Sequence, residues 1–128
     1  MKIDFLPDAA IDGRPIVRLY DFAPEEVERL REVCVDLATG KASIVPLHGC
    51  PWVERIDVGL VLFRICPRDF GVSRDDDSGM FFFDYTPDGW LEVADKLGPF
   101  ALDPASNGFN WLADEGDVAV LISRDGGW

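Results

Sequence analysis

Two helical patterns, each with a single apolar stripe, limit the architectures that this chain can adopt. The first begins at Pro24 and ends at Gly40, because proline suits the first helical position and glycine suits a left-handed C-terminal cap. Acidic residues in its first turn match the positive end of the helix dipole. Its apolar residues recur at spacings of three and four, and they are Val27, Leu30, Val33, Cys34, Leu37 and Ala38.

A second helix is predicted to begin at Thr86-Pro87-Asp88. A hydroxyl N-cap, a proline at the first helical position and a carboxylate in the first turn together form a strong start signal. Its buried face is expected to contain Trp90, Leu91, Ala94 and Leu97, and Gly98-Pro99 is expected to end it. Two helices with one apolar stripe each cover only one face of a sheet.

Segments rich in β-branched and aromatic residues predict the strands, which are 16–22, 41–47, 60–66, 80–85, 109–112 and 117–123, with a short extended piece at 52–57. Pro46 favours an edge position for the second strand. The run at 60–66 is apolar apart from Arg64, which favours a central or doubly covered strand. The last two strands form a hairpin, whereas 67–79 is expected to be a long polar loop and 103–108 a turn-rich stretch.

The element order is therefore β-α-β-(β)-β-β-α-β-β, which predicts an α+β fold. We expect a two-layer sandwich in which both helices cover one face of a mixed, mostly antiparallel sheet of about five to six strands. A ferredoxin-like split arrangement with added strands fits this order. The 128 residues are expected to form a single domain, because domains cluster near ~100–150 residues and the chain shows no repeats or linkers.

The acidic composition restricts the partners. With 24 Asp and Glu against 12 Lys and Arg, the formal net charge is −12, which argues against nucleic acids and anionic membrane surfaces as partners. The interrupted residues 1–13 do not form a signal peptide, and three unpaired-looking cysteines are typical of reduced thiols. We therefore expect a cytoplasmic protein.

Motifs that carry chemistry are sparse, and no catalytic residue, metal site or cofactor is predicted. His48 and Cys50 lie two residues apart, but Gly49 and Pro51 favour a turn rather than a nucleophilic pair. Asp75-Asp76-Asp77 does not match a calcium-loop pattern. Its charges are better explained as a guard against unwanted strand pairing by the following Met80-Phe81-Phe82-Phe83.

Aromatic residues are the most unusual local feature. Phe82 must point away from Phe81 and Phe83 on the same strand, and Phe109 and Trp111 share one side of another strand. One face of the predicted sheet has no helix over it. That face is either covered by the 67–79 loop and the termini, or exposed and available to a partner or to a second copy.

These features lead to two functional hypotheses. The first is a non-catalytic protein-interaction or regulatory binding module, with Phe82, Phe109 and Trp111 on its interaction surface and either a basic protein or a second copy as partner. The second is a binding domain or enzyme for a small anionic ligand, with a pocket between sheet and helices. A list of its candidate polar residues contains Arg64, His48 and Tyr85. Asp84 is the alternative partner of Arg64, because a guanidinium on a buried strand needs a carboxylate or an anionic ligand.

Overall fold

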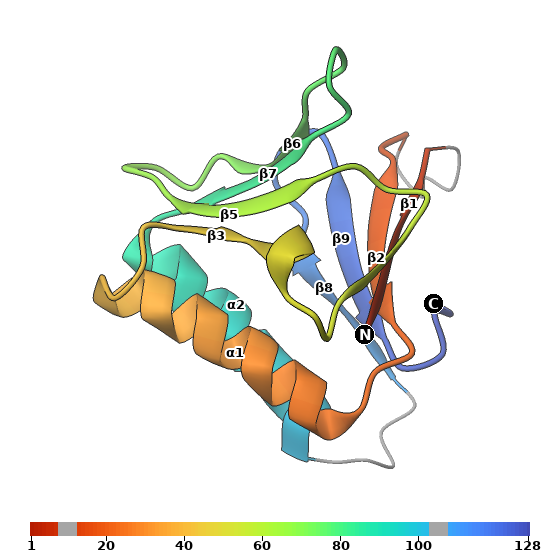
Figure 1. Cartoon of the computed structure of the whole chain (residues 1–128), viewed down its shortest axis with the longest axis horizontal. Coiled ribbons are helices and arrows are strands. Elements are labelled where there is room, and N and C mark those ends of the chain that lie inside the picture. The colour runs from red at the N-terminus through yellow and green to blue at the C-terminus, as the bar shows by residue number, and fades with distance from the viewer. Residues whose placement is uncertain (8–12, 103–107) are drawn as a thin grey trace.

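The computed structural model describes residues 1–7, 13–102 and 108–128 (Figure 1). Its elements, in chain order, are β1 (Lys2–Leu6), β2 (Ile16–Tyr20), α1 (Pro24–Thr39), β3 (Ile44–Pro46), the short 3-10 helix η1 (Leu47–Gly49), β4 (Glu54–Ile56), β5 (Val61–Ile65), β6 (Gly71–Arg74), β7 (Phe81–Tyr85), α2 (Pro87–Leu102), β8 (Phe109–Ala113) and β9 (Ala119–Ser123). The turn-rich stretch predicted at 103–108 lies outside the described residues, except for Gly108.

The strands form two mixed sheets, so the prediction of a single sheet was wrong. The five-stranded sheet has the order β4-β1-β2-β9-β8, and the four-stranded sheet has the order β3-β5-β7-β6. The two sheets meet at an angle, and the packed pair of helices lies across their open side (Figure 1). The α+β class is as expected from the sequence, and α1 and α2 pack against each other.

A close backbone contact joins the two sheets. Val72 on β6 forms an isolated antiparallel bridge with Val118, just before β9. Gly71 and Gly116 make this approach possible, because both have a positive φ and a β-carbon at Gly71 would lie 2.5 Å from the carbonyl oxygen of Glu115. The two sheets therefore touch at a point where two glycines let the backbone of β6 approach the segment before β9.

Two strands were missed in the sequence because polar residues interrupt them. β1 alternates in the manner of a half-buried strand, with Ile3 in the core and Asp4 on the opposite face. Asp4 is tolerated because Arg18 of the neighbouring β2 donates two hydrogen bonds to it, from Nε at 3.0 Å and from Nη2 at 2.5 Å. β6 lies within the predicted polar loop and pairs antiparallel with β7.

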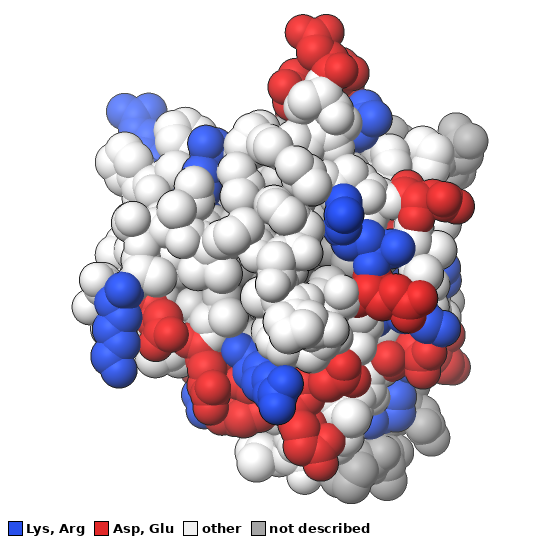
Figure 2. All heavy atoms as spheres, in the orientation of Figure 1, with Lys and Arg blue, Asp and Glu red and all other residues white. Residues whose placement is uncertain are grey.

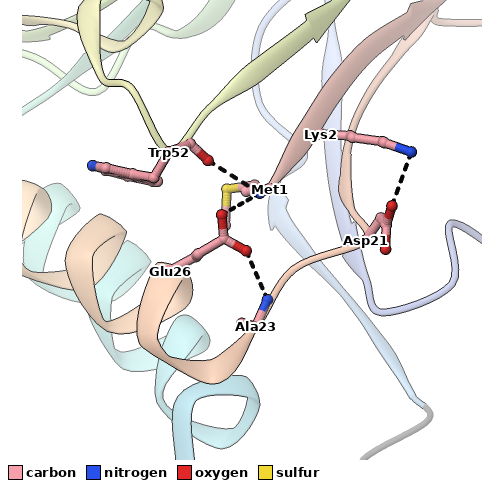
Figure 3. A network of polar contacts seen from close by, with 6 residues as sticks. All are labelled: Met1, Lys2, Asp21, Ala23, Glu26 and Trp52. Carbon is pink, nitrogen blue, oxygen red and sulfur yellow. Dashed lines mark hydrogen bonds and ion pairs between the residues drawn. The ribbon is translucent and has the colours of Figure 1, made fainter.

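Helix α1 matches its prediction at both ends, and its N-terminus is tied to the first residue of the chain (Figure 3). Glu26 accepts a hydrogen bond from the backbone N–H of Ala23 at 2.8 Å and forms an ion pair with the α-ammonium group of Met1 at 2.5 Å. The same ammonium donates to the carbonyl oxygen of Trp52. This network joins α1, β1 and the turn before β4.

Helix α2 continues beyond Gly98-Pro99 to Leu102, so its predicted end was wrong, and Leu91, expected on its buried face, is exposed. Phe100 explains the extension, because it is buried and its ring meets Phe22 edge-on at a centroid distance of 6.1 Å. Burial of a large aromatic side chain outweighs the hydrogen bond that a proline removes from the helix.

Candidate functional site

Strand β7 separates its three phenylalanines in the way that strand alternation requires. Phe81 and Phe83 are buried in the core, whereas Phe82 lies on the opposite face and is partly exposed. The two helices lie on the core side of this sheet (Figure 1). Phe82 therefore lies on a sheet face that neither helix covers.

Arg64 on β5 lies beside Phe82 and is held in place by Asp84 on β7. Nε of Arg64 donates to Oδ1 of Asp84 at 2.7 Å, and Nη2 donates to Oδ2 at 2.8 Å. The guanidinium carbon lies 4.2 Å from the centre of the Phe82 ring. The hydrogen bond to Asp84 raises the pKa of Arg64 despite partial burial. Arg64 thus has the carboxylate partner that the sequence suggested, and its charge is neutralised within the chain.

Strand register brings further apolar side chains to this face. Leu62 pairs with Phe82 and with Pro46, and Arg64 pairs with Ile44. Ile44 is 50% exposed. We call Ile44, Pro46, Leu62 and Phe82 the apolar sheet face.

Apart from the Arg64–Asp84 pair, the charged groups of the molecule surround this face rather than cover it. Figure 2 shows a largely uncharged surface over β3, β5 and η1. Acidic groups lie above it at the tip of the β6–β7 hairpin and below it along the helices (Figure 2). This distribution resembles an interface with an apolar centre and a polar rim.

Tyr85 and Arg64 lie on different faces of the same sheet. Tyr85 is buried on the core side, where its ring meets Trp90 edge-on at 5.3 Å and its hydroxyl donates to Glu115 at 3.5 Å. Burial raises the pKa of the phenol, and the negative charge of Glu115 adds to the shift. Tyr85 is therefore a neutral core side chain that does not share a site with Arg64.

His48 lies in η1, at the opposite end of β5 from Arg64. The backbone N–H of Val61 donates to Nδ1 of His48 at 3.2 Å, which joins η1 to the start of β5. Cys50 lies nearby, and its thiol is within 4.0 Å of the carbonyl oxygen of Pro46. Burial raises the pKa of Cys50, which lowers its nucleophilicity at neutral pH. The contacts of His48 and Cys50 are thus with the backbone of Val61 and Pro46, away from Arg64.

Phe109 and Trp111 lie on β8, in the other sheet, so the structure does not bring them together with Phe82. Trp111 packs against a small cluster on the outer face of the five-stranded sheet, which consists of Ile16, Ala119 and Leu121. Phe109 is 48% exposed and meets Trp111 edge-on at 6.3 Å. These two aromatic residues form a separate, smaller surface.

No group of three or more His, Cys, Asp or Glu side chains within residues 1–7, 13–102 and 108–128 is placed to hold a metal ion. A cavity between the sheets and the helices, lined by residues such as Leu19, Phe63 and Leu112, measures about 10 Å³. That volume holds at most one water molecule. Neither helix of the described chain has the length and apolar character that crossing a bilayer requires.

Of the six residues predicted from the sequence, Arg64 lies in contact with Phe82 and Phe109 with Trp111, while His48 and Tyr85 lie apart from both pairs. Ile44, Pro46 and Leu62 were missed as members of the same surface. Alternation along 60–66 places Leu62 and Arg64 on one side of a strand, but their neighbours depend on which strands pair and in what register. No protein-family model, no curated protein and no solved structure matches this chain.

Proposed function

We propose that this chain is a non-catalytic protein-interaction module that binds a partner through the apolar sheet face. The observation that carries the proposal is the combination of exposed Ile44 with Phe82 on a sheet face that neither α1 nor α2 covers. A contiguous apolar surface that stays in contact with water favours association, because a partner removes it from water.

Arg64 adds to this surface in a specific way. Arginine and aromatic residues are enriched among the side chains that contribute most to binding. Here Asp84 and the ring of Phe82 already hold the guanidinium in one conformation, so its ordering on binding costs little entropy. A carbonyl or carboxylate group of the partner therefore meets, in the Arg64 guanidinium, a hydrogen-bond donor that is already fixed in place.

The exposed edge of the sheet is a less suitable docking element than its face. Of the two edge strands of this sheet, β6 is bridged at Val72 to Val118, and β3 has only three residues, of which the last is Pro46. A short strand that contains proline resists the addition of another strand. We therefore place the partner on the face and not beside the edge.

The experiment compares two charged substitutions at exposed apolar positions. Ile44→Asp changes the apolar sheet face, and Leu91→Asp is the matched control on α2, where the leucine is 44% exposed. Tagged wild type and both variants serve as bait in a lysate of the native host, with quantitative mass spectrometry and with circular dichroism as a folding check. A protein retained by wild type and Leu91→Asp but lost with Ile44→Asp supports the proposal.

Two results would contradict it. Equal retention by Ile44→Asp and wild type would show that the partner binds elsewhere, and the absence of any retained protein would remove the interaction module altogether. Leu60→Ser, at a second exposed apolar position that precedes β5, replaces Ile44→Asp if that variant does not fold.

The small-ligand hypothesis has less support from the geometry. Arg64, His48 and Tyr85 lie at three separate places, and Arg64 already has a carboxylate partner in Asp84. The cavity of about 10 Å³ between sheets and helices is far smaller than the ~300–1,000 Å³ typical of ligand pockets.

A further inference from the structure

We infer that the partner's docking surface is basic, with lysine and arginine side chains around an apolar centre, and that the β6–β7 hairpin tip is the acidic part of the rim that selects it. This inference rests on the proposed function, because it names the chemistry of the partner that the apolar sheet face would bind.

The hairpin tip is an ordered structure that presents carboxylates outward. Asp75 holds the turn, since its Oδ1 accepts from the backbone N–H of Asp77 at 3.2 Å and its Oδ2 accepts from the hydroxyl of Ser78 at 2.8 Å. The side chain of Asp76 is 96% exposed, with Arg74 at 3.4 Å. Asp77 is also exposed. Asp76 and Asp77 are therefore the carboxylates that a partner can reach.

Strand register places this tip next to the apolar sheet face. Ser73 on β6 pairs with Phe82, and Arg74 pairs with Phe81, so the acidic turn begins two residues beyond the partner of Phe82. The tip projects beyond the end of the sheet in Figure 1, and its acidic groups border the uncharged surface in Figure 2. A partner seated on the face would meet the carboxylates at its margin.

Charge complementarity then determines the kind of partner. The Arg64–Asp84 pair is neutral as a whole, so the centre of the face contributes no net charge, while the rest of the chain gives −12. A partner with a basic rim is attracted at long range, and at the centre it buries apolar side chains and an ion pair without net charge. A second copy would instead bring its own acidic rim toward this one, which opposes self-association.

The test uses a random 12-residue peptide library displayed on phage and selected on the immobilised full chain at about 50 mM salt, where surface charges are weakly screened. The expected sequences have lysine or arginine on both sides of apolar residues. The most enriched peptide is then synthesised, its affinity is measured by fluorescence polarisation, and its contacts are mapped by amide chemical shifts.

Two matched variants remove equal charge from different places. Asp76→Asn/Asp77→Asn alters the hairpin tip, and Glu92→Gln/Asp95→Asn alters exposed acids on α2. We expect the tip variant to weaken binding about 3- to 10-fold, mainly through slower association, and the α2 variant to change it less than about 2-fold. Ile44→Asp should abolish binding.

Other outcomes would overturn the inference in distinguishable ways. Neutral or acidic peptides that still require Ile44 would reject a basic partner but keep the apolar sheet face as the docking surface. Basic peptides that shift amides on α1 and α2, and that tolerate Ile44→Asp, would reject both proposals. Concentration-dependent dimers in analytical ultracentrifugation that Ile44→Asp disrupts would identify a second copy as the occupant. Failure to enrich any sequence would also reject the inference.

Discussion

Arg64 and Asp84, on neighbouring strands of the four-stranded sheet, form a two-point ion pair that is matched on the other sheet by Arg18 and Asp4. In each case the guanidinium stands over an aromatic ring of its own sheet, at 4.2 Å from Phe82 for Arg64 and at 4.6 Å from Tyr20 for Arg18. Each pair satisfies an aspartate that is buried on the outer face of its sheet. The outer face of each sheet can therefore hold a buried aspartate, because an arginine on the neighbouring strand supplies its hydrogen bonds and the opposite charge.

The Arg64–Asp84 pair predicts unequal effects for its two single substitutions. Arg64→Leu should lower the free energy of unfolding by about 1–3 kcal/mol, because it leaves a buried carboxylate without its main donor. Asp84→Asn should cost less, because the Arg64 side chain is 36% exposed and water can solvate it. Urea unfolding of both variants and of the double variant measures the difference.

The double variant is the control for this prediction. Its loss should be smaller than the sum of the two single losses, since neither partner is then left alone. A larger loss for Asp84→Asn than for Arg64→Leu would contradict the assignment of Asp84 as the more buried partner.

Glu26 should make a pH-dependent contribution to stability. Partial burial opposes ionisation, but hydrogen bonds from Ala23 and from the Met1 ammonium hold the pKa of Glu26 below its ordinary value of 4.5. A lowered native pKa means that this stabilisation is present above pH 4.5 and is lost as the pH falls through the native value. Glu26→Gln keeps the acceptor for Ala23 and should cost about 1 kcal/mol at pH 7.

Urea unfolding at several pH values checks this expectation. The difference between wild type and Glu26→Gln should shrink as the pH falls below about 4.5. A difference that stays constant down to pH ~2 would show that the carboxylate charge is not involved.

Pro99 and Gly98 should be coupled in their effects on α2. Pro99→Ala should stabilise the protein by about 1–3 kcal/mol, because alanine restores a helical hydrogen bond at an exposed position. Gly98→Ala alone should bring no gain, because a β-carbon before proline is crowded in a helical conformation. In the Pro99→Ala background it should add about 0.5–1 kcal/mol.

Thermal and urea unfolding of the two single variants and the double variant tests this coupling. An equal gain from Gly98→Ala in both backgrounds would show that the proline does not crowd the preceding residue. A loss of stability in Pro99→Ala would mean that the proline itself supports the end of α2.

Tyr85 should remain un-ionised until the protein unfolds. Burial, followed by the charges of Glu115 and Asp69, raises its pKa above the ordinary value of 10.0. Because the pKa of Tyr85 is higher in the folded state, its neutral phenol stabilises the fold fully below pH 10. This stabilisation is lost as the pH rises toward the native pKa. In a Tyr20→Phe background, the pH-dependent rise in absorbance at about 295 nm reports Tyr85 alone, since a phenolate absorbs there, a neutral phenol does not, and tryptophan absorbance does not titrate.

Far-ultraviolet circular dichroism is recorded alongside that titration. The phenolate signal and the loss of secondary structure should coincide. Ionisation near pH 10 in a chain that is still folded would show that water reaches the hydroxyl of Tyr85.

Local patterns were sufficient for several parts of the structure. Proline at position 24, glycine at position 40 and the stripe between them predicted α1 to the residue at both ends. The Arg64–Asp84 pair was among the expectations because an arginine within an apolar strand has few ways to be satisfied. Strand alternation alone separated Phe82 from Phe81 and Phe83.

The predictions that failed did so because of contacts between residues distant in the sequence. Whether Pro99 ends a helix depends on Phe100, whose burial against Phe22 is invisible in the sequence. Whether Asp4 interrupts a strand depends on Arg18 across the sheet. In both cases a local signal was outweighed by one contact between residues far apart in the chain.

The sequence by itself predicted both helices, most of the strands and the alternation of side chains along them, because these follow from residue spacing and from caps a few residues long. Only the tertiary structure decided how the strands divide between two sheets and which apolar side chains surround Arg64. Those arrangements depend on the register of distant strands and on the close backbone contact at Gly71, whose free energy no local pattern encodes. The apolar sheet face exists only once β3, β5 and β7 are side by side.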